Sequence, residues 1–339
     1  MNPKRRIIPV FIPHYGCEHE CVFCDQRSIT GVAAPDIGDV ERAIRGKAEA
    51  FQPTELAFYG GSFTAIPVER QNELLVAARP FLEQNALGSI RVSTRPDCIS
   101  EATVARLKGY GVATIELGAQ SMCDDVLAAS RRGHTASDTV RAAGLIKGSG
   151  LALVLQMMTG LPLDTRGKSL YTAQRFTGLE PDGVRVYPTV VVRGTVLHEL
   201  WMRGEYREHS IESAVELCAE VCAVFAGANI PVIRLGLNPS AALDAGGAVA
   251  GAYHPAFGEL VYSRMYYNRA AALLEGIAPD SDVTVAVGVG CVSKMTGQRR
   301  CNVLALADKF SLRSLKVVGS DKIQGEDVKV ICDNVPEGT

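Results

Sequence analysis

Short apolar runs alternate with longer segments of helical periodicity along the first two thirds of the chain. The runs show little strict alternation of apolar and polar residues, which is typical of parallel strands buried on both faces. We expect strands at Ile7–Ile12, Glu55–Tyr59, Ser89–Ser93, Thr114–Leu117, Leu151–Met157 and Gly183–Tyr187. The segments expected to be helical are Gly38–Ala50, Val68–Glu83, Ser100–Lys108, Ser137–Lys147 and Gly167–Thr177.

This order of six strand–helix units favours an α/β fold, either a parallel barrel or an open wound sheet. Both architectures place chemistry at the carboxyl ends of the strands. Polar or glycine-rich residues directly follow several of the apolar runs, at 60–62, 94–97, 118–121 and 160–162. We therefore expect a functional site where these segments meet.

The last third of the chain has a different pattern. Two further helices, at 210–226 and 262–275, and a strand at 230–235 are expected, and the Gly- and Ala-rich segment Asp244–Ala252 is expected to be a flexible loop. A composition shift at Gly276–Pro279 predicts a boundary between a barrel domain at 1–278 and a small α+β domain at 279–339. In the small domain we expect a strand at 282–289, a short helix at 292–295, a loop at 296–300, a helix at 301–310 and strands at 315–318 and 328–332.

Composition narrows the function classes. Of the 339 residues 47% are hydrophobic, which is enough to bury a core and excludes general disorder. The net charge of −2 excludes a wholly basic nucleic-acid coat protein. The longest uncharged run, 148–163, is interrupted by Gly150, Gly160 and Pro162 and falls short of the ~18 apolar residues of a membrane-spanning helix. The basic start of the chain has too short an apolar part for a signal peptide. We therefore expect a cytoplasmic protein with reduced cysteines and no membrane partner.

Three of the ten cysteines are clustered directly after the first predicted strand. Cys17, Cys21 and Cys24 form a Cys-x3-Cys-x2-Cys motif, which in a reducing compartment points to a metal before a disulfide. Three thiolates on one loop can hold three irons of a cubane cluster and leave the fourth iron open to a small-molecule ligand. A zinc site is the alternative, with His14 or His19 as the fourth ligand.

The cysteine motif, with Phe23 directly before Cys24, resembles that of the radical S-adenosylmethionine (SAM) superfamily. Further segments match in order, and together they resemble the radical-SAM half of the Elongator catalytic subunit, which modifies wobble uridine in tRNA. They are Tyr59–Thr64, Ser93–Asp97, Glu116–Ser121, Arg132–Thr135, Met157–Pro162, Arg185–Thr189, Arg193–Thr195 and Leu200–Trp201. Nothing here resembles the acetyltransferase domain of Elongator, so we expect a branch that lacks it.

The resemblance implies a partial (β/α)6 radical-SAM barrel, a 4Fe-4S cluster, SAM as second cofactor and a reductant protein of the flavodoxin or ferredoxin type. It implies that Cys17, Cys21 and Cys24 hold the cluster. The residues that it implies at the SAM site are Phe23, Gly60, Gly61, Ser62, Thr64, Glu116 and Gln156. Gly60 and Gly61 would let the backbone approach SAM closely, and Ser62 or Thr64 would supply neutral hydrogen bonds.

Several polar residues near these segments leave two interpretations open. Glu116 lies in an apolar run, so it either contacts the ribose or amine of SAM or forms a buried ion pair with a strand neighbour. Gln156 either reaches the adenosine part or is a satisfied core amide. Arg132 and His134 are expected in a solvated turn, with cofactor contact as the alternative.

The small domain carries a separate signal. Its predicted order of elements resembles a KH-type RNA-binding unit, with Gly297 and Arg300 where that unit has Gly-x-x-Gly. Six basic residues and one acid lie between Lys294 and Lys316, a charge cluster that can meet phosphate or can be an ordinary solvated face. We expect Arg299 and Arg300 to face RNA if the unit binds it.

These features predict a radical-SAM enzyme that cleaves SAM reductively to start radical chemistry, with tRNA as the candidate substrate. The alternative is a non-catalytic RNA-binding or sensor protein whose cysteines hold a structural metal. Anaerobic reconstitution separates the two, because only the enzyme releases 5′-deoxyadenosine.

Overall fold

The structure is a computed structural model that describes residues 6–12, 21–24, 35–48 and 54–332. The chain divides into a large unit, residues 1–214 and 224–255, and a small unit, residues 215–223 and 256–339. The domain boundary predicted at 278/279 falls inside the small unit and stays a prediction. No described helix is long and apolar enough to cross a membrane.

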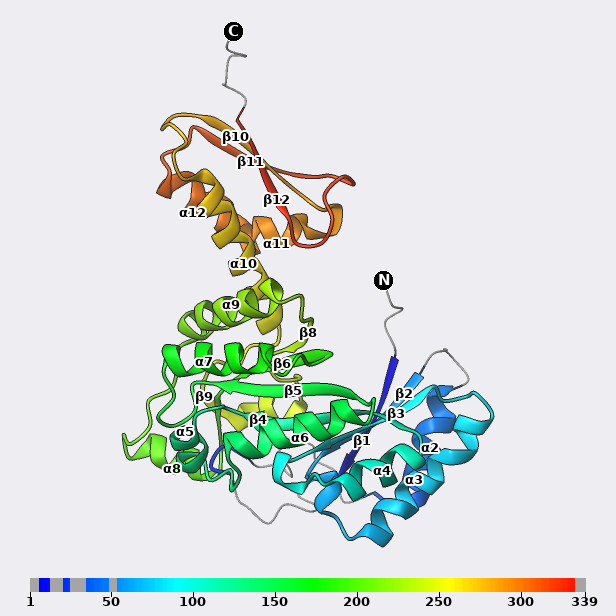
Figure 1. Ribbon diagram of the computed structural model, residues 1–339. Helices are drawn as coiled ribbons and strands as arrows, with labels where there is room; N and C mark the ends of the chain where they lie inside the picture. The colour runs from blue at the N-terminus through cyan, green and yellow to red at the C-terminus, as the bar shows by residue number, and fades with distance from the viewer. Residues whose placement is uncertain (1–5, 13–20, 25–34, 49–53, 333–339) are drawn as a thin grey trace. The chain divides into compact units, whose positions relative to one another are not determined.

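The large unit is built on a seven-stranded parallel sheet in which the strands are neighbours in chain order, β1-β2-β3-β4-β5-β6-β8 (Figure 1). This confirms the predicted α/β half-barrel. The seventh strand, β8, corresponds to the further strand expected at 230–235 after the six strand–helix units. The strands are β1 (Arg6–Ile12), β2 (Thr54–Gly60), β3 (Ser89–Thr94), β4 (Val112–Gln120), β5 (Ala152–Thr159), β6 (Gly183–Pro188) and β8 (Val232–Leu235).

Helices connect successive strands. They are α2 (Ile37–Ala48), α3 (Val68–Glu83), α4 (Glu101–Gly109), α5 (Asp124–Ala129), α6 (Ala136–Gly148), α7 (Arg166–Thr177), α8 (Val196–Met202) and α9 (Ile211–Gly227). Side-chain caps fix several of their starts, because a hydroxyl accepts a hydrogen bond from a free backbone N–H of the first turn. Ser100 caps α4, Thr165 caps α7, and Thr135 forms a capping box with Asp138 at α6.

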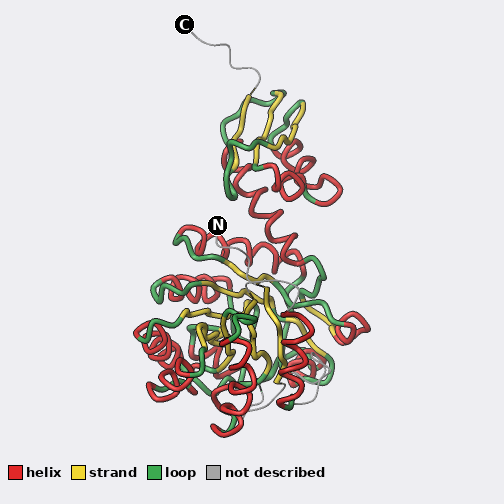
Figure 2. Tube along the Cα trace, turned by 90° about the vertical axis from the view of Figure 1, so that its right-hand side faces the viewer, coloured by secondary structure: helices red, strands yellow, loops and turns green. Residues whose placement is uncertain are grey.

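The two faces of the sheet differ in chemistry. One face is apolar and fully buried, with residues such as Phe58, Val92, Ile115 and Leu155. Helices α4, α6 and α7 contact the central strands, and Figure 2 shows helices lying around the outside of the sheet. We infer that the apolar face meets these helices. The alternate positions carry polar and charged side chains and face the concave side.

The sheet is strongly curved. In a flat sheet β2 and β6 would lie about 19 Å apart, because four steps of about 4.8 Å separate them. Yet Nη2 of Arg185 on β6 donates to the hydroxyl of Tyr59 on β2 at 2.5 Å. The two side chains span that gap only because the strands curl toward each other across the concave side.

The expectation of a flexible loop at Asp244–Ala252 is wrong. The segment forms a single helical turn, η3 (Leu243–Gly247), followed by β9 (Ala248–Gly251), which pairs with β7 (Val190–Val192). A Cβ at Gly251 would lie 2.9 Å from the carbonyl oxygen of Thr189, and this glycine has φ +89°. The small residues therefore allow close packing of two backbones rather than flexibility.

The small unit combines three strands with helices on one face. Strand β10 (Asp282–Val287) runs parallel to β11 (Ser314–Gly319) and antiparallel to β12 (Val328–Cys332). The helices are α10 (Phe257–Leu274), α11 (Val292–Thr296) and α12 (Cys301–Lys309). Their core includes Tyr266, Val285, Met295 and Leu306. The predicted small α+β arrangement is confirmed, with the strands and helices close to their expected positions.

Candidate active site at the carboxyl edge of the sheet

The loop that follows β1 is anchored through Val22. Its N–H donates to the carbonyl of Ser130 at 3.2 Å, and its carbonyl accepts from the N–H of Leu197 at 2.7 Å. The Val22 side chain is buried in a cluster with Val191, Leu197 and Tyr206, against which Phe23 packs as well. The start of α8 and the turn after α5 therefore determine where the described turn with Cys21 and Cys24 lies.

Two of the three motif cysteines lie on this anchored turn. The N–H of Cys24 donates to the carbonyl of Cys21 at 3.0 Å, and both thiols are partly exposed. Cys17, His14 and His19 lie outside the described residues, within which no three His, Cys, Asp or Glu side chains converge on one point. Whether the three cysteines hold a cluster together stays a prediction.

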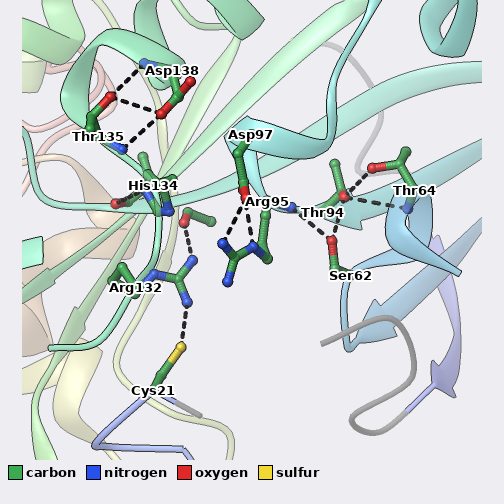
Figure 3. A network of polar contacts seen from close by, with 12 residues as sticks. Cys21, Ser62, Thr64, Thr94, Arg95, Asp97, Arg132, His134, Thr135 and Asp138 are labelled. Carbon is green, nitrogen blue, oxygen red and sulfur yellow. Dashed lines mark hydrogen bonds and ion pairs between the residues drawn. The ribbon is translucent and has the colours of Figure 1, made fainter. Parts of the chain in front are cut away.

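Arg132 reaches the cysteine turn from the segment between α5 and α6. Its Nη1 donates to Sγ of Cys21 at 3.0 Å, and its Nη2 donates to the carbonyl of Gly118 on β4 at 2.5 Å (Figure 3). The residue is only 7% exposed, and its Nε has no hydrogen-bond partner among the described residues. The expectation that Arg132 lies in a solvated turn is wrong, because β4 and the cysteine turn enclose it.

His134 is buried beside Arg132 and is neutral at ordinary pH. Burial, followed by the charge of Arg132, lowers the pKa of His134 to about 4. Nε2 of the neutral ring lies 3.2 Å from the carbonyl of Ala119, which can only accept, so Nε2 carries the proton. Nδ1 is then a buried acceptor with no partner in the described part of the chain. For His134 too, the expected solvated turn is wrong.

Three hydroxyls meet where β2 and β3 end. Oγ1 of Thr94 lies 2.9 Å from Oγ of Ser62 and 2.5 Å from Oγ1 of Thr64 (Figure 3). Ser62 is fully buried and also accepts from the N–H of Arg95 at 3.3 Å. Both hydroxyls predicted to meet SAM are therefore engaged with Thr94, which lies in the Ser93–Asp97 segment but was not among the residues expected at the SAM site. Their contact with SAM stays a prediction.

The glycines after β2 have a local structural reason. Gly60 has φ +98°, a left-handed conformation that favours glycine, and a Cβ there would lie 3.2 Å from the carbonyl carbon of Ile12. The N–H of Gly61 donates to the carbonyl of Ile12 at 2.9 Å. This close approach joins the end of β2 to the end of β1, from which the cysteine loop leaves.

A group of four charged side chains, which we call the inner charge network, lies on the concave face below this edge. It consists of Glu55, Arg91, Glu116 and Arg185. Arg91 pairs with Glu55 at 2.8 Å and lies 3.5 Å from Oε2 of Glu116, which lies 3.1 Å from Nε of Arg185. Two carboxylates thus face two guanidiniums. Glu116 has the buried ion pairs that the sequence left open as an alternative, and a SAM contact by Glu116 stays a prediction.

Further polar groups surround Arg185 and Gln156. Arg185 lies over the ring of Tyr59, and burial raises the pKa of Tyr59 to about 12. Nε2 of Gln156 donates to Oε1 of Gln120 at 3.3 Å, so its amide pairs with another side chain. Gln120 has φ +67° at a register shift at the end of β4. A side chain in the left-handed region at this edge is typical of functional sites.

Two consecutive family models match the chain. One, described as the Radical SAM superfamily, matches residues 11–170, and the second, the Radical_SAM C-terminal domain, matches residues 181–267. The chain belongs to the radical SAM superfamily. Membership brings the two cofactors expected from the sequence, a 4Fe-4S cluster and SAM, and enzymes of this superfamily need a reductant.

Within the superfamily the chain is similar to the Elongator branch. It is 27% identical over 260 residues to a tRNA uridine(34) acetyltransferase of Methanocaldococcus jannaschii, covering 62% of this chain and 47% of the relative. It is 30% identical over 271 residues to human Elongator complex protein 3, covering 64% and 49%. The chain spans about half the length of the curated relatives it matches.

Solved structures show the same fold. An archaeal Elp3 from Methanocaldococcus infernus superposes with a TM-score of 0.60 at 24% identity, over 81% of this chain and 68% of that chain. The coproporphyrinogen III oxidase HemN of Escherichia coli, a radical SAM enzyme, superposes with a TM-score of 0.50 at 18% identity, over 67% and 54%.

The residues at the carboxyl edge fit the cofactors of the family. A cluster ligated by thiolates is anionic, and the buried guanidinium of Arg132 points at Sγ of Cys21. SAM brings an amino group and a carboxylate, and the edge holds a buried free acceptor, Nδ1 of His134, and a buried free donor, Nε of Arg132, among the described residues. Groups of this kind normally have partners.

Proposed function

We propose that this chain is a radical-SAM enzyme that holds a 4Fe-4S cluster through Cys17, Cys21 and Cys24 and cleaves SAM reductively. One observation carries the proposal. The end of β2 at Gly61 is joined by a hydrogen bond to Ile12 at the end of β1, and Arg132 links Sγ of Cys21 to the carbonyl of Gly118 on β4 of the same sheet. We propose that a cluster ligand and a surface for its SAM partner thereby belong to one edge of the sheet.

A cluster held by Cys17, Cys21 and Cys24 would supply the electron for the reductive cleavage of a carbon–sulfur bond of SAM. The chain's own residues bind and orient the cofactors and exclude water from them. We propose that Val22 fixes the cysteine turn, that Gly60 and Gly61 let the protein backbone at the end of β2 approach SAM closely, and that Gln156 lies toward the adenosine part of SAM. Phe23 packs beside the cysteines and limits solvent there.

We infer that the substrate is tRNA. The support is the similarity to relatives named tRNA uridine(34) acetyltransferase and Elongator complex protein 3. In the small unit, the exposed Arg299 and Arg300 lie on the turn before α12, with φ +50° and +63°. Neither makes an ion pair within the described residues, whereas Arg313 pairs with Asp282. We propose that these two arginines contact RNA phosphates.

The reductant that we propose is a flavodoxin- or ferredoxin-type protein, and the compartment is the cytoplasm. Both follow from the chemistry, because an electron donor of low potential and reduced thiols occur together there.

The enzyme assignment is tested by anaerobic reconstitution of the full chain with iron and sulfide. We expect a brown protein that releases 5′-deoxyadenosine from SAM under dithionite. A colourless protein with one tightly bound zinc and no SAM cleavage would support the structural-metal alternative instead.

The RNA assignment is tested by titrating tRNA at several salt concentrations. Each phosphate contact contributes roughly 0.7 to the log–log slope on a single strand, so Arg299→Glu with Arg300→Glu should weaken binding and flatten the slope by about 1.4. Arg42→Glu with Arg79→Glu, on exposed arginines of α2 and α3, makes the same change in net charge and is the control. Equal losses of tRNA affinity in the two double variants would show that only the overall charge matters, and would contradict a specific contact by Arg299 and Arg300.

A further inference from the structure

Arg132 is a buried cation whose charge is not balanced by a carboxylate. No ion pair joins it to an Asp or Glu of the described residues, although it is 7% exposed. Its Nη1 donates to Sγ of Cys21, and its Nη2 donates to the carbonyl of Gly118. Its Nε has no hydrogen-bond partner among those residues. Burying an unbalanced charge is costly unless an anion compensates it.

The other ionisable groups nearby do not change this balance. Arg95 forms two hydrogen bonds with Asp97, at 3.0 and 2.8 Å, so that pair is neutral overall. His134 is a neutral ring and adds no charge. Arg132 is therefore the uncompensated positive charge nearest to Cys21 in the described part of this edge.

A cluster on Cys21 is the anion that this cation fits. The iron–sulfur core with three thiolate ligands carries a net negative charge, which grows when one electron is added. A fixed positive charge in a buried site stabilises the reduced state more than the oxidised state. A hydrogen bond to a ligand sulfur acts in the same direction, since hydrogen bonds and net charge are two of the factors that set cluster potentials.

We propose that Arg132 is a positioning residue that raises the reduction potential of the cluster by its charge and its hydrogen bond to Cys21. This inference rests on the proposed function, because it needs a cluster on Cys21. The step is a one-electron reduction of the 4Fe-4S cluster from its 2+ to its 1+ state by a flavodoxin- or ferredoxin-type donor. No bond breaks and no proton is taken up.

The test is the midpoint potential of the reconstituted cluster in full-length protein without SAM, measured by redox titration followed by electron paramagnetic resonance. Arg132→Gln keeps an N–H donor and removes the charge. It should lower the reduction equilibrium constant at least tenfold, which is about 59 mV for one electron. Arg132→Lys keeps the charge and should shift the potential less than half as far. Arg131→Gln, at the exposed neighbouring residue, should leave it unchanged.

Each outcome decides the proposal. An unchanged potential in Arg132→Gln with full cluster content overturns it, as does an equal shift in the Lys variant. If Arg132→Gln holds no cluster, a Lys variant with a cluster near the wild-type potential supports the electrostatic role. Loss of the cluster from both would make Arg132 purely structural. If wild-type protein forms no 4Fe-4S cluster at all, the proposed function fails and this inference fails with it, whereas a cluster whose potential does not depend on Arg132 overturns this inference alone.

Discussion

The inner charge network lies on the strands of the sheet, and Arg132 and His134 lie at the carboxyl edge, here called the rim, yet the charges of the two regions are compensated differently. In the network, Glu55 and Glu116 face Arg91 and Arg185, and every charge has an opposite charge within 3.5 Å. At the rim, Arg132 has no carboxylate partner in the described residues, and Nδ1 of the neighbouring His134 has no hydrogen-bond donor there.

This difference indicates that the network is part of the scaffold and that the rim is a ligand site. The network balances its own charge and ties four strands together across the concave face, although Nη1 of Arg91, Oε2 of Glu116 and Nε of Arg185 have ion-pair partners without hydrogen bonds among the described residues. A buried charge without an opposite charge in the protein is rare, so Arg132 indicates where an anionic ligand completes the structure. Loss of a cluster ligand at the rim should therefore affect cofactor binding, and loss of a charge in the network should affect stability.

The largest effect is expected at Cys21. Cys21→Ala should abolish cluster binding and SAM cleavage, because the thiolate that Arg132 contacts is lost. Iron and sulfide content after anaerobic reconstitution is the measurement. Cys123→Ala, at a partly buried cysteine outside the motif, should retain the cluster. Full cluster content in Cys21→Ala would remove this residue from the ligand set.

The network should respond in stability instead. Glu116→Ala leaves Arg185 buried without a carboxylate, which should cost about 3–5 kcal/mol of unfolding free energy. Glu83→Ala removes an exposed pair with Arg79 and should cost less than about 1 kcal/mol. Urea unfolding of both variants is the measurement. A small loss in Glu116→Ala, accompanied by weaker SAM binding, would instead assign Glu116 to the cofactor.

The stability of the protein should depend on pH through His134 at the rim. The pKa of His134 lies near 4 in the folded chain, below the ordinary 6.5, so folding favours the neutral ring. Its contribution to stability is complete above pH 6.5 and is lost as the pH falls toward 4. Between pH 7.5 and 5 the wild type should lose about 2 kcal/mol more than His134→Asn. Parallel pH profiles of the two proteins in urea unfolding would contradict this.

The smallest effect is expected at the end of β2. Gly61→Val should weaken SAM binding at least tenfold while the cluster stays bound, because a β-branched side chain intrudes where backbone and cofactor approach. SAM titration of the reconstituted variant measures this, and cluster content is its internal control. Unchanged affinity would place SAM away from Gly61.

The fold could be predicted because each buried strand is a short apolar run that can be recognised locally. Strands β7 and β9 could not, because they are three and four residues long and β9 consists of Ala, Val and Gly, which also suits a loop. The partners of Glu116 depend on register, since Arg91 and Arg185 reach it from two other strands. The contact of Arg132 with Cys21 joins distant segments through the turn after α5, and no local pattern indicates it.

The anchoring of Val22 has a consequence for how the protein is made. The cysteine turn is held by hydrogen bonds from Val22 to Ser130 and from Leu197 to Val22, so it adopts its folded position only after Ser130 and Leu197 have been synthesised. Leu197 lies far downstream of Val22 in the chain. Domains form as units during synthesis, from the N-terminus onward. While the ribosome is still making the first five strands, the cysteines of this turn have no fixed position. If these cysteines hold the cluster as proposed, iron delivery is expected after the chain has passed α8, as a step of maturation rather than of translation.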